Sequence, residues 1–267
     1  MTPGLLVLDF DGVVCDGMGE FFESSARALT DVRGKPVARS PELQARFAAL
    51  RPVVESGWEM VVLVGILAES DPSGDAALRE PTGWAAARDV YVGSHGLQRS
   101  QLTSALDTSR DRWVAQEERA WLAAHRFYDG VAEWLQRLIA AGQIFYIVST
   151  KDKRFLDKLL LWQRVPLRSD RIIGKAEPKR EKWDVLRERA AAHRLDMRDV
   201  WFVEDRLATL LDMQRHAPDL AEARLFLAGW GYIFPDRDPD AARAAGIPVL
   251  SLAQATGPFE GWLRSNP

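Results

Sequence analysis

The sequence predicts an α/β protein in which a doubly wound parallel sheet carries a large helical insertion after its first strand. Residues 131–250 alternate short apolar runs with helical patterns, which is typical of a parallel sheet covered by helices. One more apolar run, Leu5–Leu8, stands apart near the N-terminus, and more than a hundred residues with almost only helical signals follow it. We therefore expect a core of residues 1–15 and 127–267 and an all-helical cap of residues 16–126.

The first expected strand, Leu5–Leu8, runs directly into two acidic residues. Four consecutive apolar residues indicate a strand that is buried on both faces, and Asp9, Asp11 and Gly12 follow it closely. Two like charges held close together cost free energy unless a cation or strong hydrogen bonds compensate them. On this stretch alone, the two acids could also serve only to shape the following turn.

The insertion predicts helices almost throughout. Cys15–Gly19 is expected to be a flexible, turn-rich link into it. Ser40 is a suitable N-terminal cap for the second helix. The expected helices span residues 20–32, 41–50, 55–69, 83–90, 97–106 and 109–126.

Strands and helices then alternate to the end of the chain. The expected strands span residues 144–148, 171–174, 200–203, 224–228 and 247–250. The expected helices between them span residues 131–141, 153–163, 183–193, 207–215 and 240–245. Because ligands of open α/β sheets bind at the carboxyl ends of the strands, the residues that follow the strands are the candidates for chemistry.

Polar residues follow three of the strands, and a lysine-rich segment precedes one helix. These residues are Asp9 and Asp11, Ser149 and Thr150, Glu204 and Asp205, and Lys175, Lys179 and Lys182. Carboxylates from two strands form an all-oxygen pocket of the kind that Mg²⁺ prefers. A hydroxyl and an ammonium beside it suit a phosphoryl group, which a carboxylate can attack while a second carboxylate transfers protons.

These motifs resemble those of the haloacid dehalogenase superfamily of phosphohydrolases. The stretch Asp9–Val13 matches its first motif, D-x-D-G-V/T, and Ile144–Ser149 matches its second, an apolar strand that ends in Ser or Thr. Val200–Asp205 matches the fourth, and Leu225–Tyr232 is similar to a strand and W-G-Y turn of phosphoglycolate-phosphatase-like members. The resemblance covers residues 1–15 and about 127–255, and it implies a Rossmann-like core with a C1-type cap.

The resemblance also implies a role for each matched acid. Asp9 would be the nucleophile and a metal ligand, and Asp11 would be the general acid/base whose backbone carbonyl also binds Mg²⁺. Asp205 would be a direct metal ligand with Glu204 in the outer shell. The second acid that the family usually has four residues later is Thr209 here, so the metal site would depend more on Glu204.

The remaining roles concern the phosphate. Ser149 and the backbone of Thr150 would hold its oxygens, and a lysine at a helix start would neutralise it. The spacing to the fourth strand favours Lys182, with Lys179 second and Lys175 third. The implied activity is a Mg²⁺-dependent phosphatase that acts on a small phosphorylated metabolite through an aspartyl-phosphate. A phosphomutase, a dehalogenase of the same superfamily and an inactive binding or scaffold protein are the alternatives.

Composition limits the partners. The formal net charge is −3, so there is no basic field that would attract nucleic acid or a membrane surface. Cys15 is the only cysteine, which excludes an internal disulfide and fits a reducing compartment. The first apolar run ends at Asp9, too early for a signal peptide, and no apolar run is long enough for a membrane span. We therefore expect a cytoplasmic protein.

Overall fold

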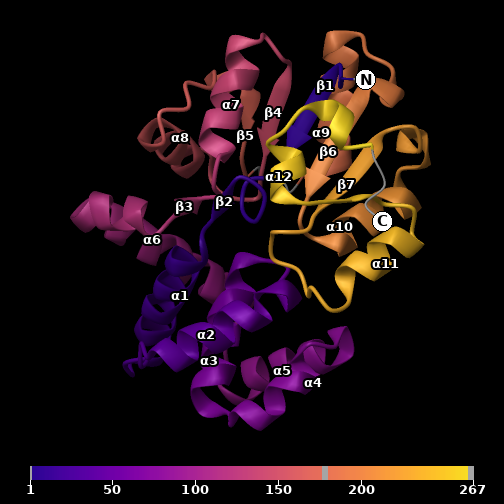
Figure 1. Cartoon of the computed structure of the whole chain (residues 1–267). Coiled ribbons are helices and arrows are strands. Elements are labelled where there is room, and N and C mark those ends of the chain that lie inside the picture. Colours follow the sequence, from indigo (N-terminus) through magenta and orange to yellow (C-terminus); the bar gives the residue numbers. More distant parts are fainter. Residues whose placement is uncertain (1, 176–179, 264–267) are drawn as a thin grey trace. The chain divides into compact units, whose positions relative to one another are not determined.

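The chain divides into two compact units, and the computed structural model describes residues 2–175 and 180–263. Unit 1 comprises Met1–Asp16 and Arg126–Pro267, and unit 2 comprises Gly17–His125. Figure 1 follows the chain through both units.

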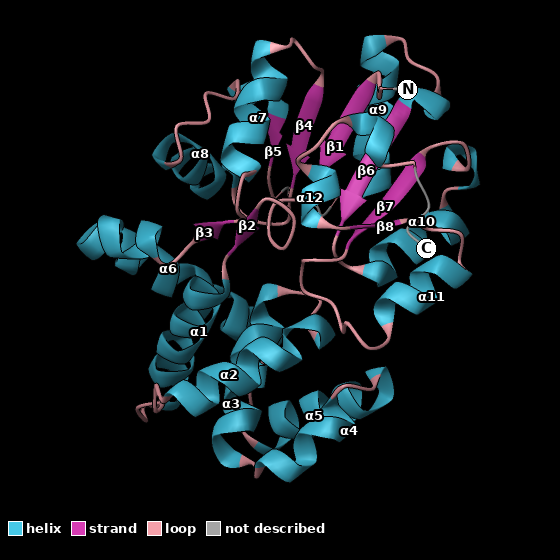
Figure 2. Cartoon of the chain, viewed as in Figure 1, coloured by secondary structure: helices cyan, strands magenta, loops and turns pink. Residues whose placement is uncertain are grey.

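Unit 1 is built on a parallel sheet of six strands in the order β5-β4-β1-β6-β7-β8. The strands are β1 (Leu5–Leu8), β4 (Phe145–Val148), β5 (Ile172–Ile173), β6 (Val200–Glu204), β7 (Arg224–Ala228) and β8 (Val249–Leu250). The apolar β1 pairs with β4 on one side and β6 on the other, which explains why all four of its residues are buried (Figure 2). The parallel sheet that the sequence predicts is thus confirmed.

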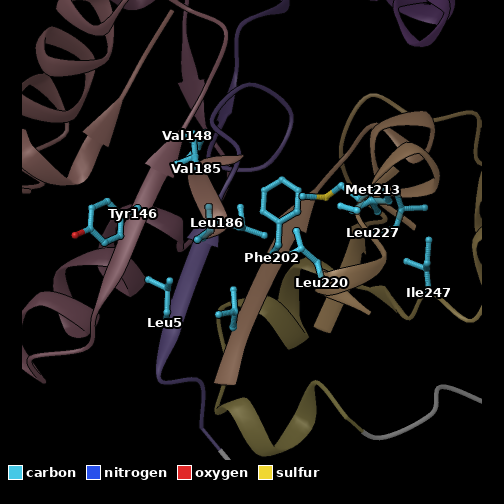
Figure 3. Packing of buried hydrophobic residues seen from close by; sticks show 14 of the residues in the cluster. Leu5, Tyr146, Val148, Val185, Leu186, Phe202, Met213, Leu220, Leu227 and Ile247 are labelled. Atoms are coloured by element: carbon cyan, nitrogen blue, oxygen red, sulfur yellow. The ribbon is translucent and has the colours of Figure 1, made fainter. Parts of the chain in front are cut away.

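Alternate residues of each strand face opposite sides of the sheet. Leu5 and Val7 lie in a core with residues of α9 (Lys182–His193), α10 (Leu207–His216) and α11 (Asp238–Ala244), part of which is drawn in Figure 3. Trp201 belongs to an aromatic cluster, in which its ring centroid lies 5.6 Å from that of Trp262 and 5.7 Å from that of Phe259. Because side chains pack against both faces of the sheet, a ligand can approach it only at the ends of the strands.

The helices of unit 1 follow the strands as the alternating pattern predicts. They are α7 (Val131–Ala140), α8 (Lys153–Trp162), α9 (Lys182–His193), α10 (Leu207–His216), α11 (Asp238–Ala244) and the short α12 (Leu252–Ala255). The short α12 lies outside the expected helices. The strand expected over residues 200–203 extends to Glu204 in β6, so this acid is part of the sheet.

The expected flexible link after Val14 is wrong. Cys15–Asp16 forms β2, which pairs antiparallel with β3 (Arg126–Phe127). The two segments meet where the chain leaves unit 1 and where it returns. A strand of two residues is too short for a recognisable pattern, and these two pair across more than a hundred residues of sequence.

Unit 2 contains helices and no β-strand, over residues 17–125, all of which the structure describes. The helices are α1 (Met18–Arg33), α2 (Pro41–Leu50), α3 (Gly57–Glu69), α4 (Asp75–Leu78), α5 (Pro81–Ser94) and α6 (Arg99–Ala123). The two helices expected over 97–126 meet at a kink within α6, which lies at Glu117 (φ −144°, ψ 55°) and not near residues 107–109. The polar residues at 107–109, which favour helix starts, were overridden because Leu106, Ser109 and Arg110 pack in the interior.

None of the helices in the described part of the chain combines the length and the hydropathy that a membrane crossing requires.

Candidate active site

Asp9 follows β1 and lies in the interior of unit 1. Its backbone N–H donates to the carbonyl of Val203 in the neighbouring β6, which continues the sheet pairing beyond the end of β1. The residue is 6% exposed. The position of Asp9 therefore follows directly from the register of two buried parallel strands.

Asp9, Glu204 and Asp205 form an acidic cluster. One ligand atom of each lies within 4.8 Å of the others, and all three residues are buried. Three carboxylates from adjacent strand ends fit a hard divalent cation such as Mg²⁺, which prefers oxygen ligands. The third carboxylate comes from Glu204 in β6, and not from α10, where Thr209 stands in place of an acid.

The turn after β7 positions Asp205. The backbone N–H of Tyr232 donates to Oδ2 of Asp205 at 2.8 Å. A Cβ atom at Gly231 would lie 2.3 Å from Cβ of Asp205, and one at Gly12 would lie 1.9 Å from its Oδ2. Two glycines thus leave the space that this carboxylate occupies, and Gly12 also adopts a φ of +87°, which other residues rarely adopt.

Lys182, the first residue of α9, reaches into the acidic cluster. Its Nζ lies 2.7 Å from Oδ1 of Asp9 and 2.6 Å from Oε2 of Glu204. Among the three lysines that the sequence analysis considered, Lys175 is exposed and Lys179 lies outside the described residues. The structure therefore places Lys182 at the cluster.

Burial and charge shift the pKa values of this pair. Burial raises the pKa of Asp9 to about 7, and the nearby Glu204 and Asp11 add to the rise against the opposing effect of Lys182. Burial alone would lower the pKa of Lys182, but the carboxylates of Asp9 and Glu204 outweigh it and raise the pKa above its usual value. The ammonium therefore stays charged, whereas the acids around it repel one another.

Asp11 is not part of the acidic cluster. Its Oδ1 lies 2.9 Å from Nζ of Lys151, and the side chain of Lys151 is only 4% exposed. The sequence analysis assigned no role to Lys151. Its place directly after Ser149 and Thr150, at the end of β4, is a signal in the sequence that could have indicated a role. A lysine after a strand is usually solvated, however.

Ser149 and Thr150 differ in their surroundings. Ser149 is buried, and its Oγ accepts a hydrogen bond from the backbone N–H of Lys151 at 3.1 Å. Thr150 is exposed. The structure therefore places the hydroxyl of Ser149, but not the side chain of Thr150, in the interior at this edge.

The Trp230–Tyr232 turn also contacts the segment that follows Asp11. The indole N–H of Trp230 donates to the carbonyl of Val13 at 3.1 Å, and the hydroxyl of Tyr232 donates to Oδ1 of Asp16 at 3.2 Å. Their polar atoms link the Asp205 side of the site to the chain after Asp11.

The family model described as haloacid dehalogenase-like hydrolase matches residues 4–213 of the chain. No curated protein is a significant sequence match.

Several solved structures share the fold at low sequence identity. A "predicted phosphatase" from Clostridium acetobutylicum is 16% identical with a TM-score of 0.56, and the alignment covers 96% of this chain and 97% of that one. A "predicted phosphoglycolate phosphatase" from Haemophilus somnus is 13% identical with a TM-score of 0.58, covering 93% and 94%. A HAD family hydrolase from Deinococcus radiodurans R1, solved with bound phosphate and sodium, is 17% identical with a TM-score of 0.50, covering 98% of each chain.

Proposed function

The chain belongs to the haloacid dehalogenase-like hydrolases, and we propose that it is a Mg²⁺-dependent phosphatase. Its substrate would be a small phosphorylated metabolite, and the reaction would pass through an aspartyl-phosphate on Asp9. The observation that carries the proposal is the separation of the two acids that follow β1. Asp9 lies in the acidic cluster, whereas the carboxylate of Asp11 lies outside it and pairs with Lys151.

The charges of the site support a divalent cation. Four carboxylates (Asp9, Asp11, Glu204 and Asp205) face two ammonium groups (Lys151 and Lys182), which leaves a formal charge of −2 among these side chains. Asp9, Glu204 and Asp205, with the backbone carbonyl of Asp11, would hold Mg²⁺. When bound, Mg²⁺ would offset this charge and that of a phosphate group, so that an anionic nucleophile can approach an anionic substrate.

The chain's own residues would perform two displacements at phosphorus. A carboxylate oxygen of Asp9 attacks the phosphorus atom, the ester P–O bond breaks, and Asp11 gives a proton to the leaving oxygen. Asp11 then takes a proton from a water molecule, which attacks the phosphorus and releases phosphate and free Asp9. Ser149, the backbone of Thr150 and Lys182 would hold the phosphate oxygens throughout.

We further propose that unit 2 is the cap that selects the substrate. The chain enters it at Gly17, only a few residues after Asp11, and returns to unit 1 at Arg126. Two structural relatives are described as predicted phosphatases, and a third was solved with bound phosphate, which supports a phosphate ester as the substrate. A capped site favours small metabolites over phosphoproteins and polymers.

Phosphate release from para-nitrophenyl phosphate tests the reaction class. We expect release by the wild-type protein with Mg²⁺, little release in EDTA, and loss of activity in Asp9→Asn. A panel of small phosphate esters then identifies the substrate. If Asp9→Asn were as active as wild type, or if halide were released from a haloacid without Mg²⁺, the proposal would be wrong.

A further inference from the structure

Lys151 is a buried cation that the proposed reaction does not use. Its side chain is 4% exposed, and its Nζ lies 2.9 Å from Oδ1 of Asp11 and 5.9 Å from the ring centroid of Phe10. A buried lysine that pairs with a carboxylate loses hydration and side-chain entropy, so such pairs seldom serve stability alone. Its partner here is the proposed general acid/base, which points to a role in the reaction.

The backbone around Lys151 is held at several points. Its N–H donates to Oγ of Ser149 at 3.1 Å, and its carbonyl accepts from the N–H of Lys175 at 2.8 Å. Gly174 packs so closely on this backbone that a Cβ there would lie 2.8 Å from the carbonyl oxygen of Lys151. The ammonium therefore projects from a fixed point at the end of β4, and not from a mobile loop.

Asp9 and Asp11 are chemically identical but have different partners. The Asp9 carboxylate shares Lys182 with Glu204 and lies in the acidic cluster. The Asp11 carboxylate is outside that cluster and forms an ion pair with Lys151. The two acids thus pair with two lysines from different parts of the chain, although only Phe10 separates the acids in sequence.

We propose that Lys151 is a positioning residue that holds the Asp11 carboxylate away from the metal-binding carboxylates, in place for proton transfer to the leaving group. This inference rests on the proposed phosphatase function. Without the Lys151 ammonium, the Asp11 side chain could turn toward the cation, and the enzyme would keep its nucleophile but lose part of its acid catalysis.

Esters with different leaving groups separate this role from a merely structural one. Breaking the bond to para-nitrophenolate needs little help from an acid, whereas an alkoxide must be protonated as it leaves. The value of kcat/KM reports the step in which Asp9 is phosphorylated. We expect Lys151→Met to lower kcat/KM about 10- to 100-fold for an alkyl phosphate and less than about 3-fold for para-nitrophenyl phosphate, a part of the roughly 100- to 10,000-fold that general acid catalysis contributes.

A double-mutant cycle with Asp11→Asn tests whether Lys151 acts through Asp11. In the Asp11→Asn background, Lys151→Met should cause no further loss with either ester. Lys151→Arg keeps the positive charge, so it should retain part of the activity with the alkyl phosphate that Lys151→Met loses. Lys153→Met is the matched control, because Lys153 lies two residues away, is 37% exposed on its side chain and pairs with Asp157. We expect it to behave as wild type.

The outcomes of these experiments distinguish a failure of the proposed role of Lys151 from a failure of the proposed phosphatase function. An equal loss with both esters, or a further loss in the Asp11→Asn background, overturns the role of Lys151 but leaves the phosphatase function intact. A wild-type protein that hydrolyses none of the esters with Mg²⁺ overturns the proposed function and this inference together. Circular dichroism checks that each variant is folded, and Lys151→Gln, with the same expected pattern, replaces Lys151→Met if the latter is not.

Discussion

The Nζ atom of Lys182 lies 2.7 Å from Oδ1 of Asp9, although 173 positions separate the two residues in the sequence. The same ammonium lies 2.6 Å from Oε2 of Glu204. One cation, whose side chain is 15% exposed, therefore pairs with two of the three carboxylates that would hold a metal ion. In the proposed reaction, it would also meet the phosphate that Asp9 attacks.

Replacing Lys182 should impair the reaction strongly. We expect Lys182→Met to lower kcat at least about 100-fold, as the loss of one group that stabilises transition-state charge typically does. Lys175→Met is the matched control because Lys175 is exposed. Steady-state phosphate release from the best ester of the panel measures both. Equal losses in the two variants would show that Lys182 has no special role.

Mg²⁺ should stabilise the folded protein through the acidic cluster. At about 100 times its dissociation constant, a ligand that binds only the folded state adds about 2.7 kcal/mol to the free energy of unfolding. We expect urea unfolding to show this gain for wild type and a much smaller gain for Asp205→Asn. Asp212→Asn is the control, because Asp212 pairs with Arg215 on α10. A full gain in Asp205→Asn would argue against the cluster as the metal site.

Because Gly231 lies close to Asp205, a larger residue at position 231 should disturb Asp205. A Cβ at residue 231 would lie 2.4 Å from the carbonyl oxygen of Gly12 as well as 2.3 Å from Cβ of Asp205. Gly231→Ala should therefore displace the carboxylate and weaken Mg²⁺ binding about 10- to 100-fold, as changes around metal ligands typically do. Calorimetry measures the affinity. Gly261→Ala, where a Cβ meets nothing within 4 Å, should bind as wild type does.

The stability of the protein should decrease in mild acid through His193. Its Nε2 lies 2.9 Å from the hydroxyl of Tyr146, and burial, together with Arg171 and Arg189, lowers the pKa of His193 below the ordinary 6.5. As the pH falls below about 6.5, the unfolded chain takes up a proton that the folded chain refuses, so this contribution to stability is lost.

Urea unfolding of wild type and His193→Gln at pH 7.5 and pH 5.5 measures this effect. The free energy of unfolding should decrease less on acidification in His193→Gln, which has no imidazole to protonate. An identical decrease in both proteins would exclude a contribution from His193.

Local sequence patterns were sufficient to predict the sheet and most of its helices. The run Leu5–Leu8 predicted a strand because a chain buried on both faces must be apolar throughout. The connecting strands Cys15–Asp16 and Arg126–Phe127 escaped prediction because each exists only through its pairing with the other. The break in α6 lies at Glu117 and not at the expected place for a related reason, since the polar residues at 107–109 signal a boundary that packing overrides.

The acids at the strand ends can be identified from the amino-acid sequence, because both the strand pattern and the spacing of Asp9, Asp11, Glu204 and Asp205 are local properties of the chain. Which cation meets which acid follows only from the packing of the folded chain. Lys182 pairs with Asp9 and Lys151 with Asp11, through contacts between residues far apart in sequence. A lysine on a loop is ordinarily solvated, and only burial beside a carboxylate gives it a role, so its partner depends on how distant segments pack.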